Sequence, residues 1–259
     1  MLSLTDIVKS SFKAVGVGIT RYHTLQALKA REQSFYDIAV LRTLPPEHTN
    51  ALLRLLDKSK AQLRQDLFVL SHLDFKKGGF FVEFGATNGV DLSNTHLLEK
   101  EFGWTGILAE PAKRWRDALA RNRTAALEFD CVWKDSNTTL SFNEVDSGEF
   151  STIDAFTASD DHRKTRKSGK IYDVRTISLE DLLEKYKAPE IVDYLSIDTE
   201  GSEFEILSAY DFSHRKFRVI SCEHNFTAMR ERLFKLLSDS GYRRVYPELS
   251  QFDDWYVLD

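Results

Sequence analysis

The sequence has few cysteines and no long hydrophobic run, and both absences exclude classes of protein. Its 259 residues contain two cysteines, Cys131 and Cys222, far apart and within apolar runs. This predicts two buried, reduced thiols rather than a disulfide framework or a cysteine metal site. No apolar stretch reaches the length of a transmembrane helix. Residues 1–20 lack the apolar core of a signal peptide, so we expect a cytoplasmic protein.

The chain also has no excess of positive charge. The chain has 35 Lys and Arg against 40 Asp and Glu, a net charge of -5. Such a balance argues against a general nucleic-acid binder or a membrane-surface binder. The length fits one large domain, or one domain with an appendage. The apolar and aromatic content is sufficient for a core.

The stretch around which the chain is organised runs from Phe80 to Gly89. An apolar run ends in Glu83 and is followed by Gly85, which predicts a buried strand that turns sharply into a helix. Gly85 would allow the turn, and Gly89 would let the backbone approach a ligand near the N–H groups that begin the helix. This is typical of a nucleotide-like cofactor site, although an ordinary strand–turn–helix without a ligand remains open.

The spacing of this motif favours one kind of cofactor. It reads E-x-G-x-x-x-G, whereas a dinucleotide fingerprint is G-x-G-x-x-G. The acidic residue before the first glycine suits a cationic ligand.

The segments before this stretch predict helices. Apolar residues recur at helical spacing over 4–15, over 24–41 and from 47 onward. We expect these helices to pack on the rest of the chain, although a dimer surface or a membrane contact remains open. Gln65 and Asp66 come just before an apolar run, where they would either begin a helix or lie beside the cofactor pocket.

The strands after it predict where the rest of a cofactor would lie. A helix over 93–102 has Ser93 and Asn94 near its start, where capping is the default role. The strand from Ile107 ends in Glu110, and an acid at that position of a βαβ unit accepts hydrogen bonds from both ribose hydroxyls. Pro111 then ends the strand.

A third strand over 125–133 would reach the same edge. At its exit Asp130 could accept the exocyclic amine of an adenine, and Cys131 and Val132 could pack on the ring. Residues 138–142 and 174–177 read as further strands. The intervening 147–170 segment is densely charged and is expected to be a mobile surface loop. The functional alternative is a lid whose basic residues meet an acidic substrate.

A second stretch carries acidic residues to the predicted crevice. A buried strand ends in Asp198, with Glu200 soon after, and the next strand delivers Glu223 and His224. Carboxyl ends of parallel strands form the ligand crevice of open α/β sheets, so these four residues should converge.

Two chemical roles compete at that crevice. His224 could be a general base that takes a proton from a hydroxyl. Alternatively Asp198, Glu223 and His224 could hold a divalent cation, Mg²⁺ or Mn²⁺, that lowers the pKa of a bound hydroxyl. A structural role for His224, as a cap of the next helix, also remains open.

Together these motifs resemble the FkbM family of methyltransferases. The resemblance rests on FVEFGATNG over 81–89, Ser93-Asn94-Thr95, Glu110-Pro111, LSIDTEGSE over 195–203, and Glu223-His224-Asn225. The element order, with two closing strands near 242–246 and 254–258, is similar to that of class I methyltransferases. The resemblance covers about 61–259 and leaves 1–60 outside. Glu83 stands where many members have Asp, which is a conservative difference.

The resemblance implies an α/β fold: a Rossmann-like seven-stranded sheet with helices on both faces, in a domain over 61–259. The helical extension over 1–60 would precede it. S-adenosylmethionine would be the donor, and a hydroxyl of a sugar or polyketide the acceptor. By position, Glu83, Gly85 and Gly89 would hold the methionine part, Glu110 the ribose, and Asp198 would lie beside the sulfonium or the acceptor.

These motifs together define a candidate site. The cofactor residues are Gln65, Asp66, Glu83, Gly85, Ala86, Asn88, Gly89, Ser93, Asn94, Glu110, Pro111, Asp130, Cys131, Val132 and Asp198. The catalytic residues are Asp198, Glu200, Glu223 and His224.

The expected activity is O-methyl transfer to a glycan or small molecule. The charged insert hints at an acidic or phosphorylated acceptor, nucleic acid is not expected, and a homo-oligomer is compatible with the sequence. One alternative is a short-chain NAD(P)-dependent oxidoreductase, but no tyrosine is followed four residues later by the lysine that it needs. The other is a non-catalytic protein that keeps the fold. Apolar residues in place of Asp198, Glu223 and His224 would have favoured it, and all three polar residues are present.

Overall fold

The computed structural model describes residues 22–145, 151–153 and 169–259 of the chain. The helix expected over 4–15 and most of the charged insert lie outside the described residues. None of the helices in these ranges is long and apolar enough to cross a membrane.

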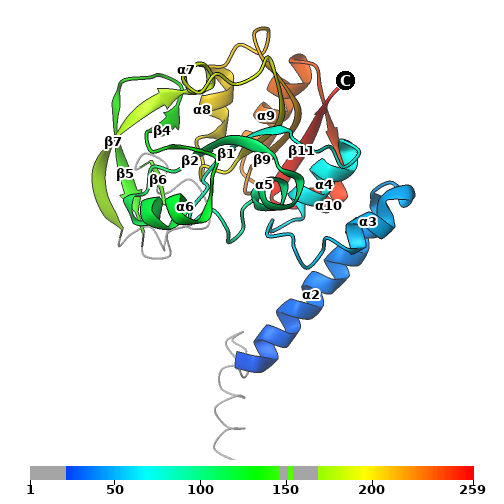
Figure 1. The fold of residues 1–259 in the computed structure, drawn as a ribbon. Helices are drawn as coiled ribbons and strands as arrows, with labels where there is room; N and C mark the ends of the chain where they lie inside the picture. Colours follow the sequence, from blue (N-terminus) through cyan, green and yellow to red (C-terminus); the bar gives the residue numbers. More distant parts are fainter. Residues whose placement is uncertain (1–21, 146–150, 154–168) are drawn as a thin grey trace, which may run out of the picture.

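A seven-stranded sheet forms the centre of the molecule (Figure 1). Its order is β10-β11-β9-β8-β1-β2-β3, and β11 alone runs antiparallel to its neighbours. The strands are β1 (Phe80–Phe84), β2 (Thr105–Ala109), β3 (Ala126–Glu128), β8 (Ile191–Ile197), β9 (Lys216–Glu223), β10 (Tyr242–Val245) and β11 (Asp253–Leu258). The predicted Rossmann-like sheet, with its closing antiparallel pair, is confirmed.

Helices cover both faces of this sheet. One apolar layer joins it to α7 (Leu179–Lys185), α8 (Glu203–Ser208) and α9 (Met229–Asp239). The other joins it to α4 (Gln65–His72), α5 (His96–Phe102), α6 (Arg116–Asn122) and α10 (Pro247–Ser250). Neighbouring residues of β1 alternate between the layers: Val82 packs in the first and Phe81 in the second. This is the strand periodicity that buries both faces of a parallel sheet.

A second, four-stranded sheet flanks the first, in the order β4-β7-β5-β6 (green in Figure 1). Its strands are β4 (Cys131–Trp133), β5 (Thr139–Glu144), β6 (Thr152–Ile153) and β7 (Lys170–Ser178). The sequence predicted one continuous third strand over 125–133. The structure divides it because the amides of Phe129 and Asp130 both donate to the Glu128 carboxylate, which turns the chain between β3 and β4.

The N-terminal helix α2 (Tyr22–Thr43) projects from the body and contacts it through its second half (Figure 1). Val40 is fully buried, and the Tyr36 hydroxyl lies 2.8 Å from the Leu63 carbonyl oxygen. Arg64 pairs with both oxygens of Asp37, at 2.8 and 3.2 Å. The short η1 (Pro46–His48) and α3 (Thr49–Leu53) then return the chain to the body.

The turn after β1 differs from the predicted strand–turn–helix. Helix α5 begins at His96, after a loop that follows Gly85. A short 3₁₀ turn, η2 (Lys113–Trp115), similarly precedes α6. The helix N-terminus therefore does not lie at Gly89, and side chains of the loop supply the hydrogen bonds that hold it.

Candidate active site

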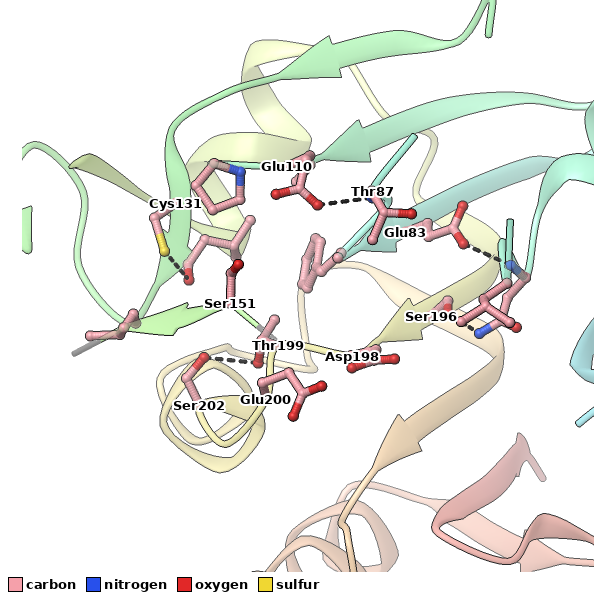
Figure 2. Close-up of a pocket in the computed structure, with 18 of the residues that line it drawn as sticks. Glu83, Thr87, Glu110, Cys131, Ser151, Ser196, Asp198, Thr199, Glu200 and Ser202 are labelled. Atoms are coloured by element: carbon pink, nitrogen blue, oxygen red, sulfur yellow. Dashed lines mark hydrogen bonds between the residues drawn. The ribbon is translucent and has the colours of Figure 1, made fainter. Parts of the chain in front are cut away.

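A cavity with about 840 Å³ of empty space lies at the carboxyl ends of β1, β2 and β8 (Figure 2). Loops that follow these strands and strands of the second sheet line it. The cavity therefore forms where the topology predicts a ligand crevice.

Glu83 organises the loop after β1. Its buried carboxylate accepts hydrogen bonds from the Asn94 amide at 2.7 Å and the Ser93 hydroxyl at 3.0 Å. The Thr95 hydroxyl also donates to it. Asn94 in turn donates its side-chain amide to the Ser196 hydroxyl, 2.9 Å away on β8. Glu83 thus bends the loop back over the sheet while lining the cavity itself.

Asn94 leaves one acceptor unused at the cavity wall. Its side-chain oxygen is buried and has no hydrogen-bond partner within the described ranges. A buried amide oxygen without a donor costs free energy.

Arg123, the residue that follows α6, also holds this loop in place. Its fully buried guanidinium donates to the Gly89 carbonyl and the Ser93 hydroxyl, both at 3.0 Å, and pairs with Glu99 at 2.8 Å. A Cβ on Gly89, whose φ is +78°, would lie 2.6 Å from the Arg123 Cγ. Gly89 therefore packs on Arg123 and not on the cavity. Sequence reasoning missed Arg123 because its partners come from a distant loop and no motif marks it.

Glu110 lies at the end of β2 and faces the cavity (Figure 2). Its two oxygens accept hydrogen bonds from the Thr87 and Ala112 amides, each at 2.8 Å. Burial raises the pKa of this carboxyl to about 7, against the lowering effect of the two amides, and the nearby Glu144 and Asp198 raise it further. Each oxygen keeps a second lone pair, so an ionised Glu110 can accept from two ligand hydroxyls.

An apolar slot adjoins Glu110. Pro111, Cys131 and Val132 line it, together with Phe142 and Ile153 from the second sheet. Burial raises the pKa of the Cys131 thiol to about 12, so the thiol is neutral at physiological pH. Both cysteines are free and buried, which confirms the sequence prediction. The alternation of 138–142 indicated a strand, but nothing in the sequence placed Phe142 beside this slot.

The other end of the cavity is acidic. Asp198 and Glu200 lie beside one another there (Figure 2). Among the described residues, oxygens of Asp198, Glu200 and Glu223 all lie within 4.8 Å of one another. Burial, then the charges of Asp198 and Glu200, raises the pKa of Glu223 well above its ordinary value. The convergence of these three carboxylates is therefore as the sequence predicted.

Gly85 permits the close approach of two strand ends at this acidic part. Its φ is +73°, and a Cβ there would lie 2.1 Å from the Asp198 carbonyl oxygen. Any other residue would push the β1 and β8 loops apart. The loop after β8 is itself held by the Thr152 hydroxyl, which donates to the Glu200 carbonyl at 3.0 Å.

His224 lies outside the acidic group, and its roles as base, ligand or cap remain predictions. Its Nε2 lies 3.0 Å from the Asp253 carbonyl oxygen, and the Phe226 amide donates to its Nδ1 at 3.0 Å. The ring proton therefore lies on Nε2 and points to the Asp253 carbonyl. Burial lowers the pKa of the ring. Its two nitrogens are thus engaged by the backbone.

The other predicted residues divide between the cavity wall and the surrounding structure. Those that line the cavity are Glu83, Gly85, Asn94, Glu110, Pro111, Cys131, Val132, Asp198 and Glu200. Those that do not are Gln65, Asp66, Ala86, Asn88, Gly89, Ser93, Asp130, Glu223 and His224.

The residues outside the wall have other partners. Gln65 donates to Asp253 at 2.8 Å, and Asp66 accepts from Ser59 at 2.7 Å. Asp130 pairs with the exposed Arg175 at 2.8 Å. Sequence reasoning also missed wall residues of the loops, namely Thr87, Asp91, Leu92, Ser151, Thr199 and Ser202. The sequence gives no signal that separates loop residues that line the cavity from loop residues that do not.

Comparisons with known proteins found one family model and several solved structures that are similar to this chain. The Methyltransferase FkbM domain matches residues 83–254. A solved methyltransferase FkbM from Methylobacillus flagellatus KT is 11% identical, with a TM-score of 0.47, over 88% of this chain and 59% of that one. This chain therefore spans about three fifths of that protein. A precorrin-6y C5,15-methyltransferase from Geobacter metallireducens GS-15 is 13% identical, with a TM-score of 0.38, over 69% and 71%.

No curated protein matches the chain. The domain match spans most of the sequence, from Glu83 in β1 to Asp254 in β11, and includes both strand-end motifs that line the cavity. On this match, the chain belongs to the FkbM family of methyltransferases.

Proposed function

We propose that the protein is an S-adenosylmethionine-dependent O-methyltransferase that acts on a hydroxyl of a sugar, a glycan or a related small molecule. The observation that carries the proposal is the buried Glu110, held by two backbone amides between an apolar slot and an acidic end. Family membership supports the donor. Neither the oxidoreductase nor the non-catalytic alternative receives support from the family match.

The residues present fit this cofactor in three parts of the cavity. The unused oxygen of Asn94, beside Glu83, suits the ammonium of the methionine part. Glu110 would accept from the ribose hydroxyls, and Cys131 and Val132 would contact the adenine. When bound, S-adenosylmethionine supplies a methyl group on a cationic sulfur.

The acidic end would receive the acceptor. Asp198 and Glu200 line this end, where they can orient a hydroxyl and take its proton as a methyl group is transferred. The backbone of Asp198 lies against Gly85, at the turn that follows β1. A cytoplasmic location, an acidic or phosphorylated acceptor that the charged insert meets, and a homo-oligomer are further parts of the proposal.

Calorimetric titration with S-adenosylmethionine, and separately with NADH, tests the cofactor. We expect the first to bind and the second not to bind. Glu110→Ala should weaken S-adenosylmethionine binding by about 10- to 100-fold, because hydrogen bonds to a charged group are worth about 1.5–3 kcal/mol.

Glu101→Ala, an exposed change on α5, is the matched control and should bind as the unchanged protein does. Binding of NADH alone would contradict the proposal. Equal affinity in the Glu110 variant would remove Glu110 from the ribose role.

A further inference from the structure

We propose that Asp198, Glu200 and Glu223 form a binding site for one divalent cation at the acidic end of the cavity. The three residues each offer an oxygen within 4.8 Å of the others, in the part of the chain that the structure describes. They come from the ends of neighbouring parallel strands, β8 and β9, which are in register at Ile197 and Cys222. The sheet therefore fixes the spacing of the carboxylates.

Glu223 supplies an independent sign of a missing partner. It is only 7% exposed, and its carboxylate makes no hydrogen bond or ion pair with any described residue. Asp253 lies opposite it in the sheet register, and that carboxylate bonds instead to Gln65. A buried carboxylate without a donor is costly. Because its oxygen points into the group formed with Asp198 and Glu200, a cation there would supply the missing contact.

The donor set indicates the class of cation. All three donors are carboxylate oxygens, which Mg²⁺, Mn²⁺ and Ca²⁺ prefer over the softer metals. The set expected from the sequence had His224 where this proposal has Glu200. Both ring nitrogens of His224 are engaged by the backbone, one by the Asp253 carbonyl and the other by the Phe226 amide.

The site deepens the proposed function, and its use in methyl transfer rests on that function. Three carboxylate oxygens leave coordination positions open to water or to an acceptor hydroxyl. A hydroxyl bound there would have a lowered pKa, which eases the loss of its proton. The acceptor class favoured by this arrangement is one whose hydroxyl reaches the cation, such as a vicinal diol of a sugar.

The test measures the binding of Mn²⁺ to the full-length protein after treatment with a chelator. Binding is detected by electron paramagnetic resonance, because the signal of free Mn²⁺ decreases as the ion binds. We expect one Mn²⁺ per chain, displaced by excess Mg²⁺. Glu223→Gln keeps the shape of the side chain and should weaken binding at least tenfold. Glu231→Gln, an exposed change on α9, is the control and should leave Mn²⁺ affinity unchanged.

The site would be overturned if the unchanged protein bound no stoichiometric Mn²⁺. It would also be overturned if Glu223→Gln bound Mn²⁺ with the same affinity as the unchanged protein. Binding of methylammonium in place of Mn²⁺ would also overturn it and indicate an amine acceptor. Should Glu223→Gln fail to fold, as judged by circular dichroism, Asp198→Asn takes its place with the same expectation. If the protein bound Mn²⁺ but not S-adenosylmethionine, only the proposed function would be contradicted. If it bound S-adenosylmethionine but not Mn²⁺, only the cation site would be contradicted.

Discussion

At the scale of single residues, burial has different consequences for the acids of the site. Glu83 accepts hydrogen bonds from Ser93, Asn94 and Thr95 and so holds the loop after β1. Glu110 has two amide donors, yet burial still raises its pKa to about 7. Two backbone donors therefore do not offset the burial of Glu110, which can change its charge near neutrality.

This difference predicts a pH-dependent cofactor affinity. In the ribose-binding role that we propose for Glu110, only its ionised form can accept from both hydroxyls, and its pKa in the ligand-free protein is raised to about 7. Affinity should therefore fall as pH drops through about 7, by up to about tenfold per unit. Calorimetry between about pH 6 and 8 measures this slope, and Glu110→Gln should flatten it. A slope that persists in the variant would assign it to another group.

At the scale of elements, the sequence was most informative where one element carries its own signal. Apolar runs that end in Glu83, Glu110 and Asp198 predicted the strands β1, β2 and β8 and their shared edge. The second sheet was not predicted, because its pairing of β4 with β7 joins segments separated by the charged insert. Arg123 was missed for the same reason: its partners come together only in the folded chain.

The attachment of α2 depends on contacts of the same non-local kind. Arg64 and Asp37 form a two-bond ion pair with side chains only 11% and 18% exposed. Asp37→Ala should weaken this attachment by about 1–3 kcal/mol, since a bond to a charged group is lost in a partly buried place. Hydrogen exchange in the second half of α2 should rise accordingly. Glu32→Ala, an exposed change on α2, should not alter it; equal exchange in both variants would show that Val40 and Tyr36 suffice.

At the scale of the whole molecule, buried acids gather near the carboxyl edge of the main sheet. Burial is the largest cause that raises the pKa of Asp66 to about 6, of Glu110 to about 7 and of Asp253 to about 8. Glu223 is raised for the same reason. Glu99 is the opposite case, with its pKa lowered to about 2 by the Thr124 amide and Arg123 against the effect of burial. Burial therefore favours the neutral form of Asp66, Glu110, Asp253 and Glu223 over the charged form.

These shifts predict that stability falls as pH rises. A carboxyl with a raised pKa in the folded state stabilises the fold below its unfolded pKa of about 4, and this stabilisation is lost as pH rises to the folded value. The melting temperature of the ligand-free protein should therefore decline between about pH 5 and 8. Asp253, with its pKa of about 8, spans this window.

Asp253→Asn should reduce the decline, by at most about 1.4 kcal/mol per pH unit. Differential scanning calorimetry across the window measures it, with the exposed Asp239→Asn as the control. The lowered pKa of Glu99 changes the pH dependence of stability only below about pH 4.5, outside this window. A melting temperature that rises toward pH 8 would contradict the prediction.

Strand β11 follows β10 in the chain but lies between β9 and β10 in the sheet. During synthesis the ribosome releases β10 first, so β9 must wait with an open edge until β11 emerges. Asp253 arrives with that strand, and through it Gln65, at the start of α4, gains its partner. The exposed edge of β9 therefore stays open until β11 pairs with it, and a nascent chain arrested before 253 would have to be kept from aggregating by chaperones.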